Sequence, residues 1–154
     1  MAKMIFVNLP VKDLAAATRF YEAIGCSKNE QFSNDQAAMM VWSDTITFQL
    51  LTHEYFATFT PKPIADAHKT SEVLICLSRD SREEVDAITG TAAAAGGKAD
   101  IRQPQDMGFL YSRAFEDPDG LCSRRYGWTS RLRSPQRAGR MPARTDGASR
   151  LCRG

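Results

Sequence analysis

The chain has 154 residues, of which 43% are hydrophobic and 25% charged, the composition of an ordinary globular domain with a core. No apolar run approaches the roughly 20 residues that span a membrane, and the opening MAKMIFVNLPV lacks the apolar centre of a signal peptide. The four cysteines form no CxxC pair and are too few for a disulfide scaffold. We therefore expect a cytoplasmic protein without a membrane partner.

The first predicted unit is a strand, a helix and a hairpin. Residues 5–11 alternate in polarity and predict a strand with Ile5, Val7, Leu9 and Val11 on one face. A helix follows, capped by Asp13 and ended by Gly25, with an apolar stripe along one side. The apolar runs QAAMMVW and TITFQLL, separated by Ser43 and Asp44, predict a β-hairpin.

The same order of elements recurs in the second half. SEVLICLS predicts a strand, and DSREEVDAITGTAAAAGG predicts a helix capped by Asp80 or Ser81. KADIRQ and FLYSRAFE are further strand candidates, and the turn DPDG follows them. Two copies of one unit predict an α+β fold with pseudo-twofold symmetry, in which each sheet packs one face on its helix and curves the other around a cleft.

The chain changes character directly after Gly120. Residues 121–154 carry nine arginines, no lysine and one acid, Asp146, a net charge of +8, whereas residues 1–120 carry 11 basic and 17 acidic residues, a net charge of −6. Such a basic segment is typical of an arm that binds nucleic acid nonspecifically. Arginine-rich sequence with Ser, Gly and Pro is also what an out-of-frame reading of GC-rich DNA produces. Residues 128–154 lack the composition for a core, so we expect them to be disordered.

The segments VNLPVKDLAAATRFYEAIG and FEDPDG, in this order, resemble the vicinal oxygen chelate superfamily of glyoxalases, bleomycin resistance proteins and extradiol dioxygenases. The resemblance covers residues 3–120 and implies two paired βαβββ modules around a small-molecule cleft. We place module one at 3–52, a link at 53–70 and module two at 71–127. Relatives of this kind often pair modules across two chains, which implies a homodimer.

The resemblance gives a second reason to regard the segment after Gly120 as unusual. In metal-dependent relatives, a glutamate follows the glycine of DPDG by four residues, and this chain has Arg124 there. Read from the third base of each codon, the coding sequence of residues 122–129 can encode F-E-A-L-W-M-D, with its glutamate at that position. We therefore hypothesise a frameshift from about residue 121, with the last strand of module two lost or altered. The alternative is a genuine basic tail.

The resemblance also implies where a divalent metal (zinc, nickel, manganese or iron) would bind. The four ligand positions of metal-dependent relatives fall on Phe6, Gln49, Glu72 and Arg124. Phe6 cannot ligate a metal, and Gln49 and Glu72 alone form an incomplete set unless the shifted frame restores a glutamate. The alternation of each strand also places Asn8, Gln49 and Glu72 on the cleft side. The alternative for Glu72 is a structural ion pair with Arg113 or a lysine.

Two functions follow from these residues. The first is an enzyme with lyase or isomerase chemistry on a carbonyl or enediolate, in which Glu72 is the catalytic base or a ligand. The second is a metal-free protein that binds small molecules, such as antibiotics, in a cleft lined by Phe6, Asn8, Gln49 and Tyr111. Arg113, together with Tyr111, is a candidate for the cleft rim. Phe6, which no shift of frame after residue 120 changes, favours the binding function or an altered metal site.

Overall fold

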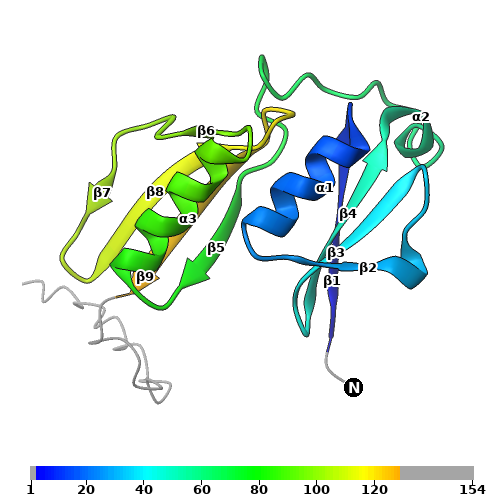
Figure 1. Cartoon of the computed structure of the whole chain (residues 1–154). Coiled ribbons are helices and arrows are strands. Elements are labelled where there is room, and N and C mark those ends of the chain that lie inside the picture. Colours follow the sequence, from blue (N-terminus) through cyan, green and yellow to red (C-terminus); the bar gives the residue numbers. More distant parts are fainter. Residues whose placement is uncertain (1–2, 129–154) are drawn as a thin grey trace, which may run out of the picture.

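The first predicted unit is present as a four-stranded mixed sheet with one helix (Figure 1). A computed structural model of the protein describes residues 3–128, so the predicted disordered tail lies outside the described residues from residue 129 onward. The first sheet has the order β1-β4-β3-β2, with β1 parallel to β4. Its elements are β1 (Ile5–Val11), α1 (Leu14–Ala23), β2 (Ser27–Asn29), a 3₁₀ turn (Glu30–Phe32), β3 (Ala37–Ser43) and β4 (Ile46–Thr52), followed by the short α2 (His53–Phe56).

The ends of α1 follow from the predicted caps. The carboxylate of Asp13 accepts a hydrogen bond from the backbone N–H of Ala16 at 2.9 Å, which satisfies a donor in the first turn. Gly25 follows the helix with φ at +108°, a left-handed conformation that glycine adopts without steric cost. The predicted helix is therefore confirmed at both ends.

The second unit repeats this plan. Its sheet has the order β5-β9-β8-β6, with β7 pairing on β8. The helix begins after Ser81, whose hydroxyl accepts from the N–H of Glu84 at 3.2 Å, so Ser81 rather than Asp80 is the cap. The elements are β5 (Ile75–Arg79), α3 (Arg82–Ala94), β6 (Lys98–Ala99), β7 (Gln105–Asp106), β8 (Leu110–Glu116) and β9 (Cys122–Trp128).

The closing strand of the second sheet is present, so the expectation that it is lost was wrong. β9 lies between β5, to which it is parallel, and β8, to which it is antiparallel. A central strand receives backbone hydrogen bonds from both neighbours, and this pairing does not depend on its side chains. The alternative expectation, an altered strand, stays a prediction, and Arg124 and Arg125 occupy the middle of β9.

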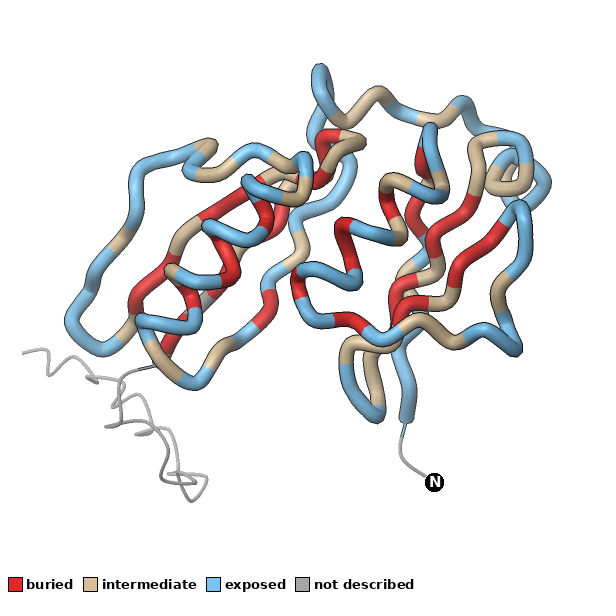
Figure 2. Tube along the Cα trace, in the orientation of Figure 1, coloured by how far each residue is buried: buried red, intermediate tan, exposed pale blue. Residues whose placement is uncertain are grey.

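The two modules share one hydrophobic core (Figure 2). In Figure 1, α1 lies in the middle of the molecule, between its own sheet and the second module. Phe20 of α1 meets Phe115 of β8 with ring centroids 6.1 Å apart, and Tyr21 meets Phe48 of β4 at 5.3 Å. Each sheet therefore turns its helix-facing side toward the shared core and leaves its other side for contacts outside this core.

Over residues 3–128, no helix has the length and apolar character needed to cross a membrane.

Candidate functional site

The face of the first sheet that points away from α1, which we call the open face, carries the polar pair that the sequence predicted. The register aligns Asn8 of β1 with Gln49 of β4, and Gln49 with Met39 of β3. Phe6 lies two residues before Asn8 on the same face and is 51% exposed. The structure therefore brings Phe6, Asn8 and Gln49 together on one side of one sheet.

The second sheet presents a cation at the equivalent place. Cys76 of β5 is in register with Arg124 of β9, which in turn is in register with Ala114 of β8. The neighbouring residues Leu77 and Phe115 lie in the shared core, so alternation puts Arg124 on the side that faces away from it. The guanidinium of Arg124 donates to the Oε1 of Gln105 at 3.2 Å.

Tyr111 and Arg113 lie on the helix-facing side of β8, away from Arg124. The hydroxyl of Tyr111 donates to the Asp86 carboxylate of α3 at 2.9 Å, and Arg113 forms ion pairs with Asp86 at 2.9 Å and Asp100 at 2.6 Å. The Arg113 guanidinium holds the pKa of Asp100 below its ordinary value. These contacts tie β8 to α3 and the following loop, and Arg113 has these two carboxylates as partners in place of Glu72.

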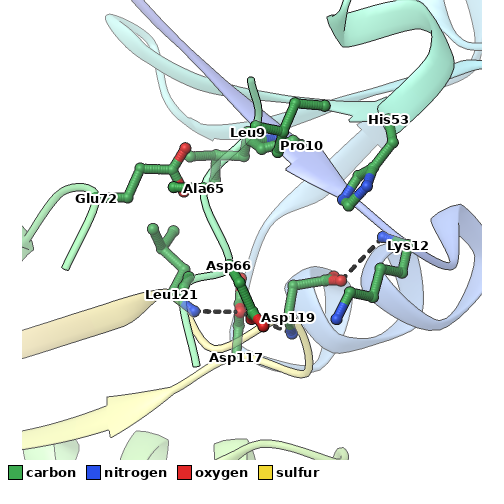
Figure 3. Close-up of a pocket in the computed structure, with 12 residues that line it drawn as sticks. Leu9, Pro10, Lys12, His53, Ala65, Asp66, Glu72, Asp117, Asp119 and Leu121 are labelled. Atoms are coloured by element: carbon green, nitrogen blue, oxygen red, sulfur yellow. Dashed lines mark hydrogen bonds between the residues drawn. The ribbon is translucent and has the colours of Figure 1, made fainter. Parts of the chain in front are cut away.

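Glu72 lies before β5, in an exposed stretch without regular structure, and Figure 3 shows it beside a pocket of about 150 Å³. We call this the junction pocket, because it lies between the end of β1, the link and the DPDG turn. Gln49 is not part of its lining, so the two predicted metal ligands do not converge. The pocket is lined by Leu9, Pro10, Lys12, His53, Ile64, Ala65, Asp66, Ala67, Glu72, Asp117, Asp119 and Leu121.

The donor set does not fit the divalent metal that the resemblance implied. Position 6 is a phenylalanine, position 124 is a cation, and Glu72 lines the junction pocket, whereas Gln49 does not. Within residues 3–128, no three His, Cys, Asp or Glu side chains gather in a group that could hold an ion. One amide oxygen alone is too weak a ligand set for a protein metal centre.

Asp117 is the polar residue of the junction that the sequence analysis missed. Its side chain is buried, and its Oδ2 accepts a hydrogen bond from the hydroxyl of Tyr21 at 3.0 Å. Burial raises the pKa of this carboxyl to about 6, although the hydrogen bonds that it accepts lower the pKa. The DPDG turn was the available signal, but a turn sequence alone does not say that its first aspartate is buried.

The comparisons with known proteins agree with this architecture. Residues 3–121 match the model of the Glyoxalase/Bleomycin resistance protein/Dioxygenase superfamily. The chain thus belongs to this superfamily. A search of curated proteins gave no match.

Solved structures extend the agreement in fold. A hypothetical protein from S. aureus is 24% identical, with a TM-score of 0.69 over 82% of this chain and 94% of that one. A superfamily enzyme from Burkholderia phytofirmans is 21% identical, with a TM-score of 0.68 over 83% of this chain and 100% of that one. A fosfomycin resistance protein from Listeria monocytogenes is 20% identical, with a TM-score of 0.60 over 84% and 93%. At these identities the likeness establishes the paired βαβββ fold.

Proposed function

We propose that this chain is a cytoplasmic protein that binds a neutral, partly aromatic small molecule without a metal, on the open face of the first sheet. The observation that carries the proposal is the group of Phe6, Asn8 and Gln49 on that face. An exposed aromatic ring offers a stacking surface, and two carboxamides both donate and accept hydrogen bonds without carrying charge. A planar ligand with amide or carbonyl groups is complementary to this set.

A second copy of the chain would turn the open face into a cleft. β1 is an edge strand of the first sheet and β5 an edge strand of the second. Besides the ligand-facing Phe6, apolar side chains lie exposed along and beside these edges: Met4, Ile5, Val73 and Leu74. Exposed apolar edges of this kind favour association, so a homodimer that covers them is part of the proposal.

The lyase or isomerase alternative needs a base beside the bound ligand. Glu72 was the predicted base, and it lies in the junction pocket with Asp117 and His53. Because Glu72 lies apart from Gln49 and the open face, the predicted base is not beside the proposed ligand, and we prefer binding to catalysis.

The binding proposal is tested with the fluorescent probe N-phenyl-1-naphthylamine, which is neutral and whose ring system and N–H group suit an aromatic and amide surface. We expect Phe6→Ala and Gln49→Ala each to weaken its binding roughly tenfold, the equivalent of about 1.4 kcal/mol. Phe32→Ala is the matched control, because Phe32 is 60% exposed on the 3₁₀ turn and outside the open face. Equal loss in all three variants would mean nonspecific surface binding and would contradict the proposal.

We further propose that the cell translates residues from about 121 onward in a frame shifted from the one that gives the present sequence. The superfamily match ends at residue 121, directly where the composition changes. Arg125 also supports it: this side chain lies in the shared core at 1% exposure, and within the described residues no salt bridge joins it to a carboxylate. The shifted frame can place a glutamate at 124 and an alanine at 125, and alanine is a residue that suits a core.

The intact mass of the protein from its native cells tests the frame. A mass that fits the shifted reading in place of 17.1 kDa is the expected result, and it would make metal titration the next experiment. A match to 17.1 kDa would overturn the shift and leave the alternative, a genuine basic segment that binds nucleic acid nonspecifically. In that case, binding to a random DNA duplex should weaken steeply with added salt.

A further inference from the structure

We propose that Asp117, buried between the two modules against Tyr21, is a pH-responsive latch, because protonation of its carboxyl in weak acid favours the buried, joined arrangement. Tyr21 belongs to α1 of the first module, and Asp117 begins the DPDG turn between β8 and β9 of the second. Their side chains meet at 3.0 Å in a buried contact that joins residues 96 apart in the chain. This is a tertiary link between modules rather than a local turn contact.

The same turn holds the first module at a second point. The backbone N–H of Lys12, directly after β1, donates to the Oδ1 of Asp119 at 2.9 Å, which Figure 3 shows as a dashed line. Asp117 itself organises the turn, because its Oδ1 accepts from the N–H groups of Asp119 at 3.0 Å and Leu121 at 2.9 Å. Any change in the charge of Asp117 therefore acts on the turn that carries both links.

The surroundings of Asp117 contain more negative than positive charge. The titratable groups packed against it or its phenol partner are Tyr21 of α1, Cys26, Asp119 of the turn, and Cys122 and Arg125 of β9. Those across the junction pocket are Lys12, His53 of α2, Asp66 of the link and Glu72. Arg125 acts on Tyr21 from the core, but within the described residues no ion pair joins a cation to Asp117.

The direction of the pH effect follows from burial. A carboxyl that titrates near pH 6 in the fold and near 3.9 in the unfolded chain binds its proton more tightly when folded. Its protonation therefore favours the folded, latched state below about pH 4, and this contribution is lost as the pH rises through 6. Above that pH the ionised carboxylate gains by hydration, and the junction pocket beside it gives water a way in.

Carboxyl NMR of the full chain, with Asp117 assigned by its absence in Asp117→Asn, tests the latch first. We expect the Asp117 carboxyl to titrate with a midpoint near pH 6. In Tyr21→Phe the titration midpoint of Asp117 should be higher, because this variant lacks a hydrogen bond that favours the ionised form. A midpoint near 4 in the unmodified protein, or an unchanged midpoint in Tyr21→Phe, would overturn the proposal.

The second measurement asks whether the modules respond. Relative to Asp117→Asn, the folding equilibrium constant of the unmodified protein should fall about tenfold between pH 5 and pH 8. The hydrogen-exchange protection of the Lys12 amide, corrected for intrinsic exchange rates, should also fall between pH 5 and pH 8. Asp44→Asn, in the exposed turn between β3 and β4, is the matched control and should keep the behaviour of the unmodified protein. Protection that is equal at the two pH values would show that the pair titrates without acting as a latch, which would also overturn the proposal.

Discussion

Replacing Arg125 by methionine is expected to stabilise the fold by about 1–4 kcal/mol, the range seen when buried ion pairs give way to apolar residues of similar volume. Arg125 is the largest of the fully buried side chains, and burial lowers the pKa of its guanidinium to about 10. Its Nε has no hydrogen-bond partner, and its ring contacts are Phe115 at 4.6 Å and Trp42 at 5.5 Å. These contacts recover only part of the cost of removing a cation from water.

Urea unfolding at neutral pH measures this effect, with Arg113→Met as the matched control. Arg113 is also an arginine of the second sheet, but it bonds two carboxylates, Asp86 and Asp100. Its replacement leaves both acids without their cation and should destabilise the fold. If Arg125→Met destabilises the fold as well, then the arginine suits its site, and the argument for a shifted frame loses its structural support.

Much of the fold could be predicted because the first module follows its local rules. The alternation in residues 5–11, the cap Asp13, and the cap at Asp80 or Ser81 were each sufficient to place an element, since period and capping act over a few residues. β9 was harder, because its own residues disfavour a buried strand. Its formation depends on pairing with β5, which is distant in the chain, and with β8, which precedes it across a turn. A local sequence pattern does not reveal pairing with these two strands.

The candidate site was predictable in part for the same reason. Strands β1 and β4 have one clearly apolar face, so Asn8 and Gln49 could be assigned to the other. In β8 both faces hold apolar residues, and alternation could not decide on which side Tyr111 lies. Glu72 was placed on a strand that begins only at Ile75. The burial of Asp117 arises from the packing of two modules, which no single segment encodes.

At the junction of the modules, Gly120→Ala should destabilise the fold by about 2–5 kcal/mol. Two causes contribute, the strain of a left-handed backbone conformation in a residue with a Cβ and the overpacking of that Cβ against its neighbours. Gly120 has φ at +90°, and a Cβ there would lie 2.7 Å from the backbone N and Nδ1 of His68 and 2.9 Å from the carbonyl carbon of Ala67. Backbone of the link thus closes directly over the turn, and a methyl group would push the two apart.

Gly108→Ala separates the two causes. Gly108 also has a positive φ, +78°, but a Cβ there would meet no atom within 4 Å, so its replacement should cost only about 1–2 kcal/mol of strain. Thermal unfolding of both variants gives the comparison. If Gly120→Ala loses no more stability than Gly108→Ala, then the backbone of the link shifts at little cost to accommodate the Cβ. In that case the link does not hold the DPDG turn in place, and the hydrogen bonds of Tyr21 and Lys12 are what join this turn to the first module.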